Sequence, residues 1–374
     1  MKKNLFTLEI LMFTLVFTFL AGCSNSDDDT GNGGTIGGST LAERLQTLKT
    51  NAVSNTEYHF ELTSNESMEA QGLYYGKDNI TIRLTSSSGE KTISLIGDGK
   101  LFTIGGGVTL ILGNGVTLVG RSSNSSSLVE VNGTLIMNEG AKITGNTNIK
   151  NGTSAAGVFV SYGIFTMKGG EITDNTVTDG SGGGVFMNGG TFTMEGGKIS
   201  GNTARESGGV EVYSGTFTMK GGEISRNAAR SNAGGVGGAL GTFMMEGGEI
   251  SSNTAANSCG GVNARNASFT MEGGKISGNT AANGDGGGVC APTFVITDGE
   301  ISNNTATGNG GGVHASSSFT MTGGEISGNT ASSGGGVWYR GYGTFAKIGG
   351  TIYGSENESN SNRNLATEGL GNAV

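Results

Sequence analysis

The sequence is poor in several residue types that usually shape a fold or an active site. Its 374 residues include 1 proline, 1 tryptophan, 2 histidines and 3 cysteines, but 73 glycines. The glycines follow no Gly-X-Y period, which excludes a collagen triple helix, and their number disfavours a helical solenoid. The formal net charge of −9 argues against nucleic acid as a partner, because an acidic chain repels phosphates. These absences leave a repetitive fold turned by glycine.

One short stretch recurs along most of the chain. TFTMEGGKISGNTA at 191–204 returns as TFTMKGGEISRNAA at 216–229 and as SFTMEGGKISGNTA at 268–281. Its phenylalanine recurs every 25 to 27 residues from Phe165 to Phe345, and a GGGV-like stretch recurs in step with it. A fixed period of this length indicates stacked structural repeats.

The order of residues within each repeat predicts short strands. Polar and apolar residues alternate in TFTM at 191–194, so Phe and Met lie on one face of a strand. Glycine pairs such as the one at 196–197 supply the sharp turns. Three short strands in about 26 residues, repeated head to tail, predict an all-β, right-handed parallel β-helix of about 10 coils.

The other segments divide the chain further. The amphipathic stretch LAERLQTLKTNA at 41–52 is expected to form a short helix that caps the open end of the β-helix, since terminal repeats need capping. The predicted parts are a lipoprotein signal peptide over 1–23, a flexible linker over 24–40, an N-terminal cap over 41–78, β-helix repeats over 79–354 and a polar C-terminal tail over 355–374.

The N-terminus resembles that of bacterial lipoproteins. Two lysines precede an apolar run over 10–20 that is too short to span a bilayer, and LAGC at 20–23 resembles a lipobox. The resemblance implies cleavage before Cys23 and acylation of that cysteine, and hence a lipid-anchored protein of the bacterial cell envelope. Ser24 follows the cysteine in place of an aspartate, which favours the outer membrane and the cell surface.

The repeats also resemble a known family. From about residue 90 to 353 the chain is similar to pectin-lyase-like, right-handed β-helix surface lipoproteins of host-associated bacteria, built on GGGV…GTFTMxGGEISGNTA repeats. GGGV at 286–289 and the Ile199…Asn202 spacing are similar, more loosely, to repeats of chlamydial polymorphic outer-membrane proteins, with Gly in place of Ala and Ile in place of Phe. The resemblance implies the fold and no particular ligand, because one fold hosts many activities.

Asparagine recurs at one turn position of each repeat. We interpret this row as an internal ladder in which each amide bonds to its neighbours along the rod, because stacked asparagines stabilise repeated β structure. The ladder residues are Asn146, Asn175, Asn202, Asn227, Asn253, Asn279, Asn304 and Asn329.

The positions that differ between repeats indicate a binding surface. They lie one and three residues after the GGGV valines and are expected to face outward, while the frame around them barely changes. Exposed aromatic residues and arginine often anchor interfaces. The candidate binding face comprises Phe159, Phe186, Tyr213, Arg265, His314, Trp338 and Arg340. The alternative is that these solvated positions vary freely and that Trp338 only caps the last coil.

Patterns for catalysis and metal binding are sparse. Aspartates in the repeats are few and unpaired, and the two histidines, His59 and His314, are far apart in the sequence. No zinc spacing, Ca²⁺-binding nonapeptide or P-loop appears. We therefore assign no catalytic residue, metal or cofactor.

The two cysteines within the repeats occupy different positions of adjacent coils. Cys259 lies three residues before Val262, whereas Cys290 lies one residue after Val289. In register they would be too far apart to bond, so the spacing disfavours a disulfide unless the loop slips.

Together these features predict a lipid-anchored surface module with a binding, adhesive or structural role. Host matrix proteins or glycans are the expected partners, and the oligomeric state is left open. The alternative is a polysaccharide lyase or glycoside hydrolase of the pectin-lyase-like fold, with acidic residues from separate coils converging on one cleft.

Overall fold

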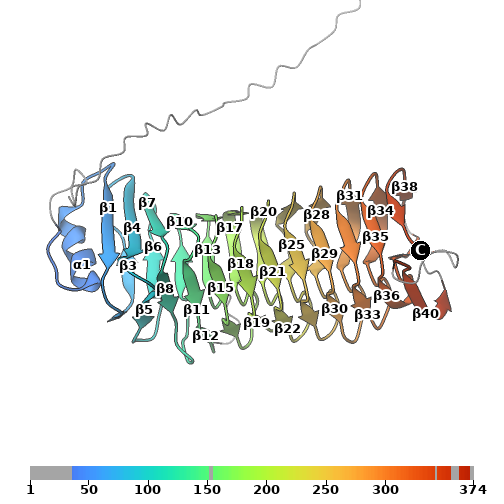
Figure 1. Ribbon diagram of the computed structural model, residues 1–374, viewed down its shortest axis with the longest axis horizontal. Coiled ribbons are helices and arrows are strands. Elements are labelled where there is room, and N and C mark those ends of the chain that lie inside the picture. Colours follow the sequence, from blue (N-terminus) through green and yellow to red (C-terminus); the bar gives the residue numbers. More distant parts are fainter. Residues whose placement is uncertain (1–35, 151–154, 342, 355–361, 371–374) are drawn as a thin grey trace, which may run out of the picture.

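The computed structural model describes residues 36–150, 155–341, 343–354 and 362–370. They form a rod of stacked coils with one helix at its N-terminal end (Figure 1). About 11 coils follow each other at a spacing of about 26 residues, and their strands form parallel sheets. The predicted parallel β-helix with a short helical cap is therefore confirmed.

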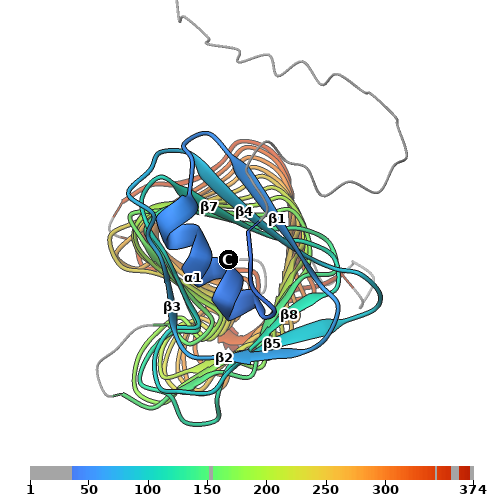
Figure 2. The ribbon, with the colours of Figure 1, turned by 90° about the vertical axis from the view of Figure 1, so that its left-hand side faces the viewer.

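The largest sheet has 19 strands and covers two sides of the rod (Figure 2). Its strands are β1 (Glu57–Leu62), β3 (Gln71–Leu73), β4 (Ile80–Ser86), β6 (Phe102–Ile104), β7 (Val108–Leu112), β9 (Val129–Val131), β10 (Thr134–Met137), β13 (Val158–Ser161), β14 (Ile164–Met167), β17 (Val185–Met194), β20 (Val210–Met219), β23 (Val236–Gly238), β24 (Thr242–Met245), β27 (Val262–Asn263), β28 (Ser268–Met271), β31 (Val289–Ile296), β34 (Val313–Met321), β37 (Val337–Tyr339) and β38 (Phe345–Lys347).

Two smaller sheets close the rest of each coil. The 12-stranded sheet contains β2 (Glu66–Met68), β5 (Lys91–Leu95), β8 (Val116–Val119), β11 (Lys142–Thr144), β15 (Glu171–Thr173), β18 (Lys198–Ser200), β21 (Glu223–Ser225), β25 (Glu249–Ser251), β29 (Lys275–Ser277), β32 (Glu300–Ser302), β35 (Glu325–Ser327) and β39 (Thr351–Ile352). The 9-stranded sheet contains β12 (Thr147–Asn148), β16 (Thr176–Val177), β19 (Thr203–Ala204), β22 (Ala228–Ala229), β26 (Thr254–Ala255), β30 (Thr280–Ala281), β33 (Thr305–Ala306), β36 (Thr330–Ser333) and β40 (Leu365–Leu370).

The coils wind with a right hand. Seen from the N-terminal end, the chain passes clockwise from β1 through β2 and β3 to β4 while it recedes from the viewer (Figure 2). A right-handed crossover is the usual connection between parallel strands that twist to the right.

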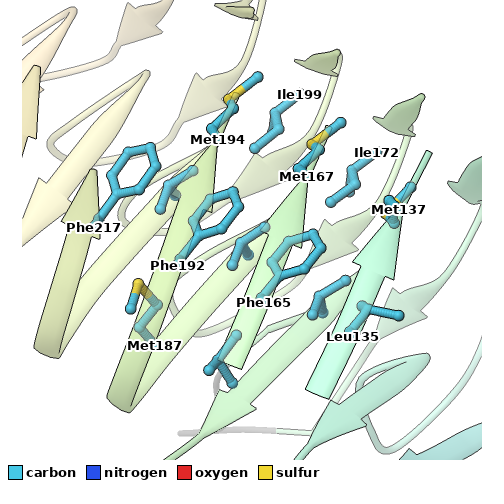
Figure 3. Close-up of a cluster of buried hydrophobic side chains, with 14 of the residues drawn as sticks. Leu135, Met137, Phe165, Met167, Ile172, Met187, Phe192, Met194, Ile199 and Phe217 are labelled. Carbon is cyan, nitrogen blue, oxygen red and sulfur yellow. The ribbon is translucent and has the colours of Figure 1, made fainter. Parts of the chain in front are cut away.

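The core consists of rows of identical side chains. Phe165, Phe192 and Phe217 lie directly above one another, with ring centroids 4.5 Å and 4.6 Å apart (Figure 3). This spacing is close to the strand separation of about 4.8 Å, because strands in register place equivalent residues one strand apart. Ile172 and Ile199 form a second buried row on the facing sheet.

The N-terminal cap is smaller than predicted. Helix α1 (Leu41–Asn51) begins with a capping box between Thr40 and Glu43 and buries Leu45 among the first coils. Strand β1 then pairs in register with β4, so the β-helix begins at Glu57 and not at residue 79. Buried and exposed residues alternate along β1, so the strand pattern is present there without the repeated TFTM stretch.

The C-terminal segment is not only a polar tail, as was predicted from residue 355 onward. Strand β40 pairs with β36, and Leu365 lies opposite Thr330 in that ladder. The pairing gives the last coil of the 9-stranded sheet partners for its backbone groups, which a free tail would not do.

The asparagine row is a continuous chain of hydrogen bonds inside the rod. The Asn202 backbone N–H and Nδ2 both donate to Asn227 Oδ1, and Asn227 bonds to Asn253 in the same way, all at 3.0 Å. Two residues outside the expected set extend the row, because Asn124 donates to Asn146 Oδ1 and Asn329 donates to Asn364 Oδ1.

Candidate functional site

The residues that come directly after the GGGV valines form a row along the rod. Their side chains face away from the core but are largely covered by the loops next to them. In each coil, the residue four positions earlier adopts a left-handed backbone and folds over this row; Ser207 does so at φ 54°. Ser207 Oγ thereby donates to the carboxylate of Glu211, and only 8% of Glu211 is exposed. Phe186, which was expected to be exposed, is also only 8% exposed. The prediction of a solvent-facing row is therefore wrong for these positions.

The seven candidate binding residues form two separate groups. The first is an aromatic group of Phe159, Phe186 and Tyr213, with successive ring centroids 5.8 Å and 6.1 Å apart. The ladder between β17 and β20 shifts after Met187, and Tyr213 is the residue left without a partner. Such a bulge re-aims a side chain, and here it leaves Tyr213 46% exposed.

The second group lines a cavity of about 460 Å³ near the C-terminal end of the rod. Strands β27, β31, β34 and β37 lie side by side there. The lining residues lie in the first half of β31 and β34, in the loops before these two strands, within β37, or just after the ends of β27 and β37. We call this cavity the arginine–tryptophan pocket. Its lining residues are Arg265, Asp285, Ala291, Pro292, Asn309, His314, Ser316, Trp338 and Arg340.

The register explains why these residues meet. His314 lies opposite Cys290 on one side and opposite Trp338 on the other, so the three form one row across β31, β34 and β37. Arg265 lies two residues after β27, and Arg340 lies directly after β37. The pocket therefore contains four of the seven predicted binding residues, brought together from three coils.

His314 is held between an aromatic ring and a carboxylate. Its imidazole stacks on the Trp338 indole, and its Nε2 lies 3.6 Å from Asp285 Oδ2. Burial lowers the pKa of His314, and Arg265 and Arg340 lower it further, whereas Asp285 acts in the opposite direction. The imidazole is therefore kept neutral to a lower pH than a free histidine.

A disulfide between Cys259 and Cys290 borders the pocket, which corrects the expectation from their spacing. Their Cα atoms are 5.4 Å apart. Cys259 lies beside Gly286 of the next coil, since the Gly260 N–H bonds to the Gly286 carbonyl. A Cβ at Gly286 would collide with Cys290 Sγ, so the absence of a side chain there leaves the space that lets the two sulfurs meet.

Sequence reasoning missed Asp285 and Pro292 as parts of this site. Asp285 Oδ1 accepts hydrogen bonds from the Asn309 backbone N–H and Nδ2, at 2.8 Å and 3.2 Å. Pro292 is the only proline of the chain, and it lies where the ladder between β31 and β34 shifts. The signal that could have found the site is the rarity of its residues, because the only tryptophan, the only proline and both cysteines of the repeats gather here.

A second depression, of about 650 Å³, lies near the N-terminal end along the 12-stranded sheet. Both lysines of its lining already have partners of opposite sign: Lys142 Nζ lies 3.5 Å from Glu171 Oε2, and Lys198 Nζ lies 3.0 Å from Glu223 Oε2. It contains no aromatic residue. The arginine–tryptophan pocket is therefore the stronger candidate.

Nowhere in 36–150, 155–341, 343–354 and 362–370 do three His, Cys, Asp or Glu side chains gather as a metal site would require. Over the same ranges, no helix has the length and apolar character needed to cross a membrane. The predicted lipidation site, Cys23, lies outside the described residues.

No protein-family model, curated protein or solved structure matches this chain. The assignment of a function therefore depends on the chemistry of the site.

Proposed function

We propose that this protein is a lipid-anchored module of the bacterial cell surface that binds a ligand through the arginine–tryptophan pocket. The observation that carries the proposal is the meeting of Arg265, Arg340 and Trp338 at one cavity. Arginine and tryptophan are the residue types that most often dominate binding energy at interfaces. The rigid repeat frame holds them in place, as a binding surface requires.

An array of host glycans and matrix proteins, probed with the purified protein, tests this proposal. We expect binding that is lost when Trp338 is replaced by alanine. Tyr74→Ala is a matched control, because Tyr74 is 56% exposed and lies outside both groups of candidate residues. Absence of binding to every component, or equal loss in both variants, would refute the proposed role of the pocket.

The membrane anchor is tested separately. The proposal places acylation at Cys23, so Cys23→Ser should move the protein from the detergent phase to the aqueous phase of extracted cells. Mass spectrometry should find lipid on the N-terminal peptide of the unaltered protein only. Unchanged partition of the variant would contradict lipid anchoring at this residue.

The alternative, a polysaccharide lyase or glycoside hydrolase of the pectin-lyase-like fold, is supported by one feature of the same pocket. A neutral imidazole flanked by two arginines is the kind of base that removes a proton next to a carboxylate. However, only 12% of the His314 side chain is exposed, and its Nε2 faces Asp285. We therefore favour binding, and release of unsaturated sugar products from acidic polysaccharides would decide for the enzyme.

A further inference from the structure

A second surface of the rod has no part in the proposed function. It lies on the bend between the two sides of the 19-stranded sheet and extends over four successive coils. Four large apolar side chains are exposed there, those of Tyr162, Ile164, Tyr213 and Leu240. We call these four residues the tyrosine–leucine patch. The patch adjoins the aromatic group, because the Tyr213 ring belongs to both.

An irregular backbone accompanies each of the two tyrosines. Tyr162 has a left-handed conformation, at φ 60°, which is uncommon for a bulky residue. Its ring lies beside Gly189 of the next coil, where a Cβ would stand 2.5 Å from Tyr162 Cδ1. Tyr213 is the residue that the bulge in β20 leaves without a partner. Irregularities of this kind cost stability and persist mainly at functional sites.

The exposed groups follow one another along the rod. The Tyr162 ring lies over the coil that contains Gly189, and Tyr213 belongs to the coil after it. Leu240 is in the next coil, and its N–H donates to the Tyr213 carbonyl at 2.9 Å. The order along the rod is therefore the Tyr162 ring, Tyr213 and Leu240, on three adjacent coils with Tyr213 in the middle.

The patch is uncharged although the chain is acidic. The formal net charge is −9, yet no charged residue occurs in 157–167, 182–194, 212–219 or 231–245, the stretches that form this bend. Two acidic rods repel each other, so they approach most easily where neither carries a charge. A basic partner would instead be drawn to the acidic parts of the rod. The charge pattern therefore favours a second copy of this chain as the partner.

The size of the patch fits a weak dimer. Tyr162 and Leu240 are 76% and 74% exposed, and Ile164 and Tyr213 are about half exposed. At about 200 Å² for a fully exposed large side chain, the four expose roughly 500 Å² on one copy. This is near the upper end for the largest apolar patch of a typical monomer. Two copies would cover about 1,000 Å², the lower limit for a specific protein interface.

We propose that the tyrosine–leucine patch joins two copies of this chain side by side, with the rods antiparallel. A twofold axis at right angles to the rods, beside Tyr213, places Tyr213 against its own copy and the Tyr162 ring against Leu240 of the second copy. Parallel rods would also cover the patch, but they would oppose the two Arg265 side chains, which lie on the same bend two coils beyond Tyr213. In antiparallel rods, four coil steps of about 4.8 Å separate Arg265 from the coil opposite its copy, so that their repulsion is screened.

The antiparallel arrangement has a consequence for cells. The N-terminal ends of the two rods lie on opposite sides of the contact, so copies held at Cys23 on facing cell surfaces, as proposed above, can pair. The pairing requires neither a ligand in the arginine–tryptophan pocket nor the acyl chain. Failure of the proposed function and failure of the pairing are therefore distinguishable.

Sedimentation velocity of the purified protein tests the pairing. All variants carry Cys23→Ser, which removes the proposed acylation site and the need for detergent. We expect a weak, reversible monomer–dimer equilibrium that added salt strengthens, because salt screens the repulsion between acidic rods. A protein that stays monomeric at its highest soluble concentration, at low and at high salt, would overturn the proposal.

A matched pair of variants identifies the surface. Leu240→Ser should raise the dissociation constant about a hundredfold, because the contact loses one buried leucine from each copy, at about tenfold each. Ile348→Ser is the control, since Ile348 is 77% exposed but lies in the turn between β38 and β39, outside the patch. It should leave the equilibrium unchanged. Circular dichroism shows whether both variants retain the fold, and equal weakening in both would refute the patch as the contact.

Crosslinking tests the orientation. With Cys23→Ser in place, the other two cysteines form the disulfide, so Tyr162→Cys and Leu240→Cys each carry one free thiol. A short bis-maleimide should join the two variants to each other in a mixture and crosslink each variant alone only weakly. Efficient crosslinking of Tyr162→Cys with itself would show parallel rods, and absence of any crosslink would show that the patch is not the contact. Either result would contradict the proposed arrangement.

Discussion

The His314 imidazole and the Trp338 indole stack with centroids 4.6 Å apart and planes inclined by 12°. The contact joins β34 to β37 on the outside of the rod. Each ring covers one face of the other, which would otherwise be exposed. Burial and two nearby arginines lower the pKa of this imidazole, and Asp285 opposes them.

The stack should respond to acid later than a free histidine does. Because burial lowers the pKa of His314, the neutral form persists in the folded protein below the ordinary value of 6.5. The stability linked to this shift is complete above pH 6.5 and is lost as pH falls from that value through the lower folded value. Trp338 fluorescence should therefore stay constant from pH 8 to about pH 6.5 and change below it. His314→Gln should abolish the change, and a transition centred above pH 6.5 would contradict the prediction.

The Cys259–Cys290 disulfide should stabilise the coils that form the pocket. It joins residues 31 positions apart, and closing a loop of that size is worth about 3.7 kcal/mol through the lower entropy of the unfolded chain. Replacing both cysteines by alanine should lower the free energy of unfolding in urea by about this amount. A reducing agent should lower the stability of the unaltered protein to the same level and leave the double variant unchanged. An effect of the reductant on the double variant would point to another cause.

Removing one amide from the asparagine row should be costly. Asn227 accepts two hydrogen bonds from Asn202 and donates to the Ile199 carbonyl and to Asn253 Oδ1. Asn227→Leu would leave these buried groups without partners, at a cost of about 3 kcal/mol or more. Denaturation midpoints measure the loss, and the exposed Asn257→Ala should change stability by less than about 0.5 kcal/mol. Similar losses in both variants would argue against the ladder as a stabilising element.

Glu211 should make the protein less stable in mild alkali. Burial raises its pKa to about 7, while the hydrogen bond from Ser207 lowers it and the charge of nearby Glu206 raises it. Because the pKa of Glu211 is raised in the folded protein, the contribution of its neutral carboxyl to the free energy of unfolding is complete below pH 4.5. This contribution is lost as pH rises through 7, by up to about 3 kcal/mol. Glu211→Gln should remove this loss when unfolding at pH 5 and pH 8 is compared. Glu195→Gln, at an exposed position, should retain it.

The frame of the protein could be predicted because the repeat fixes its own register. Phe192 and Phe217 occupy equivalent positions in successive coils, so parallel pairing in register must stack them. The asparagines also recur at one position of each repeat, so the same pairing stacks them. The first coil was missed because β1 lacks the repeated stretch, although Tyr58 and Phe60 alternate with exposed residues as a strand requires.

The candidate site could be predicted only in part, because its loops do not follow strand alternation. A left-handed residue folds each loop back over the row four positions later, and this turn covers Phe186 and brings Cys259 to Cys290. The alternation of polar and apolar residues predicts on which face of a strand a side chain lies. It does not predict which loop covers that face. The contact of Asp285 with His314 depends on the same loops, so no pattern within one repeat could have indicated it.

The position of the pocket along the rod sets a distance. Eight strand-to-strand steps separate β3, beside helix α1, from β31, where Pro292 lies. At about 4.8 Å for each step, these steps add to roughly 40 Å. If the chain is held at Cys23 as proposed, the rod works as a rigid spacer that keeps the pocket beyond the reach of the lipid head groups. A ligand on a neighbouring surface could then be engaged without the two surfaces touching.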